Sequence, residues 1–221
     1  MKVNYLRLIG LLIVLVVLFS INWGVVQASD GITGSYGYSV YLPLAVSGQN
    51  TQVNQFPNLS DFIDQVKDGQ SNVVRGMYVT QKMALSVVQQ PDGNYGYIST
   101  ASDTATQFML AATQDVIGLL AHNNLAGKHF SDLSVGNRIS IIYGDGTVAQ
   151  YTVSEVYQYQ ALSPNSSTSD FVDLNSGELL TAADIFIKFY MAGDQVTLQT
   201  CLERNGNLSW GRLFIVALPI P

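Results

Sequence analysis

Short runs of β-branched and aromatic residues, separated by turn-forming residues, make up most of the chain after residue 73. The run VVRGMYVTQKMALSVVQQ predicts one long or two short strands, stopped by the turn signal Pro91-Asp92-Gly93. The run VIGLLAHN is apolar until it reaches His122, which is typical of a buried strand. These patterns favour a sheet over a helical bundle.

The second half of the chain carries the clearest hairpin signal. In NRISIIYGDGTVAQYTVSEVYQYQAL, two strand-like runs flank Gly144-Asp145-Gly146, whose glycines supply the positive φ angles that a tight turn needs. The even spacing of Tyr151, Tyr157 and Tyr159 predicts one face of a strand. Two further strands are predicted at QVTLQTC and RLFIVALPIP, joined by the loop LERNGNLSWG.

Three short helices interrupt this pattern. NLSDFIDQVKDG predicts a helix capped by Asn58 or Ser60, and residues 103–114 predict a second one. TAADIFIKFY predicts a third, with Thr181 and Asp184 at capping-box spacing. Many short strands with few helices indicate a mainly β fold, a barrel or sandwich of about 150 residues.

The N-terminus has the three parts of an export signal. Lys2 and Arg7 form a positive region, an apolar core follows, and Val26-Gln27-Ala28 is a small-residue cleavage pattern. The alternative is an uncleaved membrane anchor, since residues 8–26 are nearly long enough to span a bilayer. Either way, the positive flank stays inside and the remaining chain is expected outside the cytoplasmic membrane.

The expected organisation has three parts. Residues 1–28 are a signal peptide or membrane anchor, residues 29–72 a polar linker or stalk with a short helix, and residues 73–221 a β domain. The formal net charge of -6 comes with only ten Lys and Arg residues, and no basic cluster follows the N-terminus. Nucleic-acid binding is therefore not expected. The protein is expected to be a monomer.

Cys201 is the single cysteine of the chain. Exported proteins usually pair or avoid cysteine, so a lone thiol leaves three interpretations: an inert buried residue, an intermolecular bridge or a reactive nucleophile. Cys201 and His122 each end a predicted strand, and Arg212 opens one. The three side chains therefore have the chance to meet at one rim of a barrel. There an imidazole would activate a thiol, and a guanidinium would favour a thiolate and an oxyanion.

The segment Thr197-Leu198-Gln199-Thr200-Cys201 resembles the TLxTC signature of sortases, the cysteine transpeptidases of bacterial cell surfaces. The order His, Cys, Arg and the step of 11 residues from 201 to 212 are similar to the family's as well. The stretch from Gly118 to Val153, with Phe130, Leu133 and Gly136, is similar to its histidine region. The resemblance covers about residues 73–221.

The resemblance implies a closed sortase-like β-barrel in which His122, Cys201 and Arg212 are catalytic and Thr200 helps to build the substrate pocket. Cys201 would attack a carbonyl of an LPxTG-like sorting signal on a surface protein and form a thioacyl enzyme. His122 would serve as acid and base, Arg212 would stabilise the oxyanion, and an amine acceptor would complete the transfer. No cofactor and no metal are expected, because the acidic calcium cluster of some class A sortases has no counterpart in the chain.

Besides the missing calcium cluster, one feature departs from that pattern; a second histidine competes with His122, and two alternatives stay open. Ala121 precedes His122 where many sortases have glycine, and His129, in the polar stretch AGKHFSD, is a competing histidine that is interpreted as an exposed loop residue. Another exported Cys/His acyl-transfer enzyme, such as an L,D-transpeptidase, is one alternative, although its SxGC-type motif is missing. A non-catalytic surface β-barrel is the other, and it predicts a buried Cys201 far from His122.

Overall fold

The computed structural model describes residues 56–166 and 168–221. The predicted signal or anchor at residues 1–28 and most of the predicted linker lie outside the described residues. Within the described part, no helix has the length and apolar character needed to cross a membrane.

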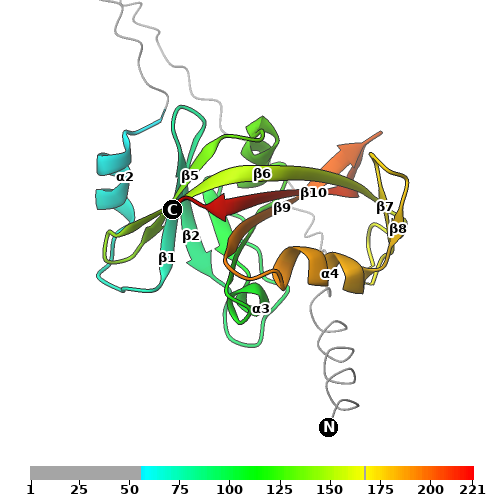
Figure 1. Ribbon diagram of the computed structural model, residues 1–221, viewed down its shortest axis with the longest axis horizontal. Coiled ribbons are helices and arrows are strands. Elements are labelled where there is room, and N and C mark those ends of the chain that lie inside the picture. The colour runs from blue at the N-terminus through cyan, green and yellow to red at the C-terminus, as the bar shows by residue number, and fades with distance from the viewer. Residues whose placement is uncertain (1–55, 167) are drawn as a thin grey trace, which may run out of the picture.

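Eight strands form a closed barrel (Figure 1). In the barrel the order is β10-β9-β4-β3-β2-β1-β5-β6, and β6 pairs with β10 to close it. Most neighbours are antiparallel, whereas β2–β3 and β4–β9 are parallel. The strands are β1 (Val74–Val79), β2 (Met83–Gln89), β3 (Thr104–Gln107), β4 (Val116–Leu120), β5 (Arg138–Tyr143), β6 (Val148–Ala161), β9 (Gln195–Arg204) and β10 (Asn207–Pro219). The predicted mainly β closed barrel is confirmed.

Short elements surround the barrel on its outside. The two small strands β7 (Phe171–Asp173) and β8 (Leu179–Leu180) extend the sheet beyond β6. Figure 1 shows α4 (Ala182–Tyr190) lying below the long strands β6 and β10, at the same end as β7 and β8. The remaining helices are α2 (Leu59–Val66), α3 (Met109–Ala112) and the 3-10 helix η1 (Ala126–Asp132).

Three apolar clusters hold these layers together. The first fills the barrel interior, where alternate residues of each strand meet, such as Leu198 of β9 and Ile215 of β10. The second lies on the outer face of β4, β9, β10 and β6, where α3, α4 and β7 cover it, and it contains Phe189 and Phe214. The third joins α2 to the outer face of β1 and β5. Residues of the second cluster also line the cavity that is described below.

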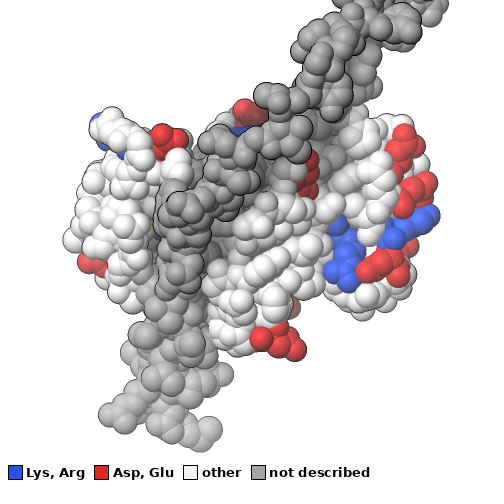
Figure 2. All heavy atoms as spheres, turned by 180° about the vertical axis from the view of Figure 1, so that it is seen from behind, with Lys and Arg blue, Asp and Glu red and all other residues white. Residues whose placement is uncertain are grey.

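The helix predicted within the linker packs on the barrel. Asn58 caps α2 by accepting a hydrogen bond from the backbone N–H of Asp61 at 2.9 Å. Phe62 is buried against Tyr78. The densest group of charged side chains in Figure 2 lies at this end of the molecule, where Lys67 pairs with Asp64 and Arg75 pairs with Asp68.

Two predicted elements differ from the structure. Residues 104–107, predicted as the start of a helix, form β3, and only residues 109–112 are helical. Thr104 and Thr106 are β-branched, and the parallel ladder with β2 decides the conformation in favour of a strand. The tyrosines of β6 also do not share one face. A shift of register opposite Val216 and Ala217 places Tyr151 in the barrel interior and Tyr159 in the outer cluster.

The connection predicted as a loop between Cys201 and Arg212 is mostly strand. β9 continues to Arg204 and β10 begins at Asn207. Asn205 and Gly206, with φ of 54° and 79°, make the two-residue turn, and this left-handed pair matches the twist of the flanking strands. The prediction that Cys201 ends a strand and that Arg212 opens one was therefore wrong: both residues lie inside a long hairpin.

Candidate active site

Cys201 and Arg212 are paired directly across the β9–β10 ladder. In β9, Val196 and Leu198 belong to the barrel interior, and residues of the other parity point outward. Cys201 is therefore on the outer face of the barrel wall, partly buried, and Arg212 stands opposite on the same face. The site is on the wall of the barrel and not on its rim.

His122 follows β4, which is the second strand paired with β9. β4 runs parallel to β9 with Leu120 opposite Gln199, and Ala121 extends the ladder by donating from its N–H to the Gln199 carbonyl at 3.2 Å. His122 comes two residues after Leu120 and lines the same cavity as Cys201. Strand β9 thus lies between the strand that carries Arg212 and the strand that leads to His122.

Burial sets the protonation state of His122. Removal of solvent from the partly buried ring lowers the pKa of His122 below its ordinary value of 6.5, and the backbone of Ile98 opposes this shift. The imidazole is therefore neutral at pH 7 and able to accept a proton.

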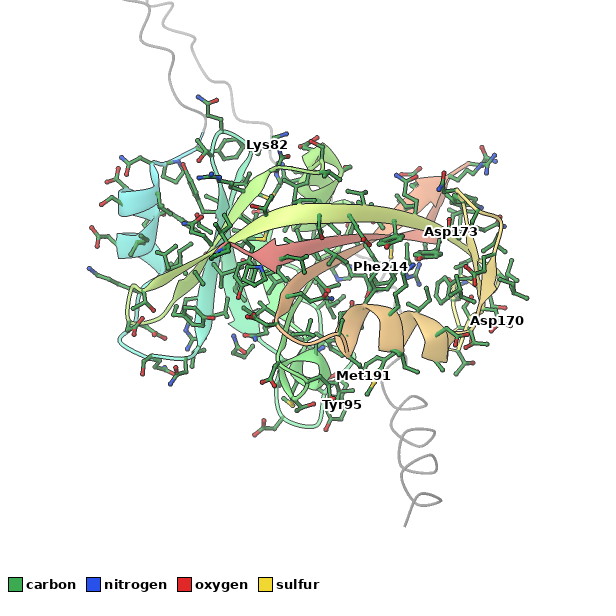
Figure 3. All side chains as sticks on the ribbon, viewed as in Figure 1. Lys82, Tyr95, Asp170, Asp173, Met191 and Phe214 are labelled. Carbon is green, nitrogen blue, oxygen red and sulfur yellow. The ribbon has the colours of Figure 1, made fainter. Side chains whose placement is uncertain are left out.

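The three side chains line one cavity of about 160 Å³. Arg212 is the one residue of its lining that carries a permanent charge. The apolar wall comes from the outer cluster and α4, and Figure 3 shows Phe214 between β10 and α4. The wall consists of Ile98, Phe108, Leu120, Phe171, Ala182, Ile185, Phe186, Tyr190 and Phe214. A cavity of this kind suits an apolar side chain of a ligand that reacts at its mouth.

Backbone carbonyls hold the Arg212 guanidinium. Nη1 donates to the carbonyls of Ser209 at 2.9 Å and Gly211 at 2.8 Å, and Nη2 donates to Pro164 at 3.3 Å. Among the described residues, no carboxylate lies within ion-pair distance of it. Neutral acceptors fix its position without cancelling its charge, so Nε and the second Nη2 hydrogen can donate to an anion.

Three polar residues of TLQTC, Thr197, Gln199 and Thr200, have separate structural tasks. The Thr197 hydroxyl donates to the Phe189 carbonyl at 2.8 Å and so ties down the end of α4. The Thr200 hydroxyl donates to the Ala121 carbonyl at 2.8 Å, next to His122. Gln199 accepts a hydrogen bond from the Tyr190 hydroxyl. The motif therefore fixes both the helix that covers the cavity and the backbone that precedes the histidine.

The competing histidine lies elsewhere. His129 is in η1, its Nδ1 is 3.9 Å from Asp132 Oδ2, and it does not line the cavity. Its side chain is 20% exposed, so the interpretation as an exposed loop residue was wrong, because the helix η1 and the ring of Phe56 partly cover it.

No group of three or more His, Cys, Asp and Glu residues placed to hold a metal occurs in residues 56–166 and 168–221. In the GDG turn, Asp145 Oδ1 accepts from the N–H of Thr147 at 2.9 Å and from its hydroxyl at 2.7 Å. This carboxylate thus stabilises its own turn.

Sequence reasoning missed much of the cavity. It did not find Gln199, Tyr190 or the apolar residues of α4, nor the loop residues 164–166 that close one side. The period of two in TLQTC was a usable signal for Gln199, since residues 199 and 201 of a strand share a face. Nothing local marks the α4 residues, because they reach the cavity only when α4 packs on β9 and β10.

The fold is similar to that of solved sortases. Sortase C-1 from Actinomyces oris matches with a TM-score of 0.47 at 11% identity, covering 77% of this chain and 85% of that one. Sortase A from Corynebacterium diphtheriae matches with a TM-score of 0.45 at 13% identity, covering 78% and 73%. Sortase D5 from Clostridium perfringens gives 0.43 at 13% identity, covering 76% and 91%. Family models and curated proteins give no match to the chain.

Proposed function

We propose that the protein is a sortase-like cysteine transpeptidase. The observation that carries the proposal is that Cys201, its direct ladder partner Arg212 and His122 all line one largely apolar cavity. A neutral imidazole and an uncompensated guanidinium beside a thiol are the groups that acyl transfer needs.

The first half of the reaction forms a thioacyl enzyme. His122 accepts the thiol proton as the Cys201 sulfur attacks a peptide carbonyl carbon, which makes the C–S bond and moves the carbonyl electron pair to oxygen. Arg212 donates hydrogen bonds to this oxyanion. The oxyanion collapses, the C–N bond breaks, and His122 returns its proton to the leaving amine.

The second half transfers the acyl group. An amine acceptor attacks the thioester and His122 takes its proton. The C–S bond breaks to give a new amide, and His122 returns the proton to the departing Cys201 sulfur. Water in place of the amine gives hydrolysis. Thr200 supports this site through its hydrogen bond to Ala121, which holds the backbone before His122.

The partners in this proposal rest on the resemblance to sortases, and the location rests on the N-terminal pattern. The substrate class is a surface protein with an LPxTG-like sorting signal, and the acceptor is an amine at the cell surface. The positive and apolar N-terminal residues would export or anchor the domain on the outer face of the cytoplasmic membrane.

Thiol chemistry tests the proposal. The rate at which iodoacetamide alkylates Cys201 is measured against pH in the wild type, in His122→Ala and in Arg212→Ala, with His129→Ala as the matched control. In parallel, mass spectrometry follows acyl-enzyme formation with LPxTG-like peptides, with Cys201→Ala as the blank.

The proposal predicts a reactive native thiol whose pH profile shifts in the His122 and Arg212 variants but not in the control, together with an acyl adduct on Cys201. A thiol that reacts only after denaturation would overturn it and favour the non-catalytic surface domain. An acyl adduct from a peptide that lacks an LPxTG-like sequence would favour another type of Cys/His acyl transferase.

A further inference from the structure

Gln199 lies on the same face of β9 as Cys201, two residues before it, and it lines the same cavity. Its side-chain oxygen accepts the hydroxyl of Tyr190, the last residue of α4. Tyr190 is 3% exposed. No acceptor for the Gln199 Nε2 group is found among the described residues, and none of their buried side-chain polar atoms lacks a partner. The amide nitrogen is therefore open to the cavity.

The tyrosine fixes which end of the amide faces the cavity. A buried phenol must donate its proton, and the Gln199 oxygen is its acceptor. Burial raises the pKa of Tyr190 above its ordinary value, so the phenol keeps this proton at neutral pH. With the oxygen bonded to Tyr190, the NH₂ group is the end of the amide that is left for a ligand.

The cavity gives this NH₂ group a defined target. The cavity wall is largely apolar and includes Leu120, Phe186 and Phe214, so an amide donor in it is unusual and directional. Its distance along the strand from Cys201 is two residues, about 6.6 Å at 3.3 Å per residue. An extended peptide with one carbonyl at the Cys201 sulfur has another main-chain carbonyl at this spacing.

We propose that Gln199 is a substrate-binding residue whose side-chain NH₂, oriented by Tyr190, donates to a main-chain carbonyl of the peptide about two residues from the one that Cys201 attacks. This inference rests on the proposed function, because it takes the cavity to hold a peptide. It assigns to Gln199 the selection of an extended peptide over a small electrophile, and to Tyr190 the orientation of the amide.

Competition between two thiol reagents tests the inference on the full chain. The first is iodoacetamide, and the second is an acetylated leucyl-alanyl chloromethyl ketone, in which the thiolate displaces chloride from carbon and which presents main-chain carbonyls. The measured quantity is the ratio of the two second-order rate constants at Cys201. Three variants are compared with the wild type. Gln199→Glu keeps an acceptor for Tyr190 but lacks the NH₂ group. Gln199→Leu combined with Tyr190→Phe leaves no unpaired phenol, and Tyr190→Phe alone removes the orienting hydroxyl.

The matched control is Gln158→Leu, an exposed glutamine of β6 outside this cavity. We expect the wild-type ratio to favour the peptidyl reagent. The ratio should fall about 5- to 20-fold in Gln199→Glu and in the double variant, because one hydrogen bond in a cavity is lost. It should fall less in Tyr190→Phe. Circular dichroism checks that each variant is folded.

Two results would overturn the inference in distinguishable ways. A peptidyl preference that survives in both Gln199 variants would remove Gln199 from substrate binding and leave the proposed transpeptidase intact. A wild type that shows no preference for the peptidyl reagent would overturn both, because the cavity would then not hold a peptide.

Discussion

Cys201 and Arg212 face each other as direct partners in the antiparallel β9–β10 ladder. Directly opposite side chains of such a pair have Cβ atoms about 5 Å apart, so the ladder itself fixes the distance between nucleophile and guanidinium. The Asn205-Gly206 turn connects the two strands, and a shift of register between Asn207 and Gly211 precedes the pairing of Cys201 with Arg212.

The first prediction concerns the shape of this cation. Arg212→Lys keeps the charge but loses the planar fork that contacts Ser209, Gly211 and Pro164. We expect kcat/KM for peptide transfer to fall about 10²- to 10³-fold, as for loss of an oxyanion donor. The exposed Arg138→Lys is the control, and equal losses in both variants would show that the planar fork at Arg212 has no specific role.

The second prediction is a pH dependence of stability that His122 causes. Because burial lowers the folded-state pKa of His122 below 6.5, the unfolded chain binds this proton more tightly. The contribution to stability is fully present above pH 6.5 and is lost as the pH falls through the lower folded-state value. The melting temperature of the wild type should therefore drop more steeply below pH 6.5 than that of His122→Gln.

The control for this experiment is His129→Gln, which lies outside the cavity. If the melting temperatures of the wild type and His122→Gln fall equally as the pH is lowered below 6.5, a desolvated, neutral His122 is contradicted.

The third prediction separates packing from positioning at Thr200. Thr200→Val keeps the shape but leaves the Ala121 carbonyl without its donor, which should cost about 1–3 kcal/mol of unfolding free energy. Transfer should slow further, because the backbone before His122 is released. Thr200→Ser keeps the hydroxyl and should restore most of the activity. If Ser and Val behave alike in kinetics and in denaturant titrations, the hydrogen bond has no positioning role.

The fourth prediction concerns the close approach of η1 to the site. A Cβ at Gly127 would lie 2.8 Å from the carbonyl oxygens of Ala121 and His122 and against the Thr200 hydroxyl. Gly127→Ala should therefore lower the unfolding free energy by about 1–3 kcal/mol, in line with overpacked sites. Urea titration measures this, with the exposed neighbour Lys128→Ala as the control. A neutral Gly127→Ala would mean that η1 can move away from Thr200.

The sequence alone determined most of the local structure. Period-two patterns gave the strands, Asn58 and the Thr181–Asp184 capping box marked α2 and α4, and TLQTC placed the thiol on a strand next to a strand with an arginine. These features follow from contacts between residues close in the chain. The Asn205-Gly206 pair is itself a local hairpin signal, which the prediction of a loop overlooked. Cross-strand pairing decided only the shift of register between Asn207 and Gly211.

Only the tertiary structure decided the composition of the site. Closure of the barrel puts β9 between β4 and β10. This brings the backbone of Ala121 into contact with Thr200, which lies 79 positions later in the chain. The packing of α4 on the outer face supplies Tyr190 and the apolar wall, and with them the orientation of Gln199. Such contacts depend on which faces must be buried together, and no short stretch of the sequence contains that information.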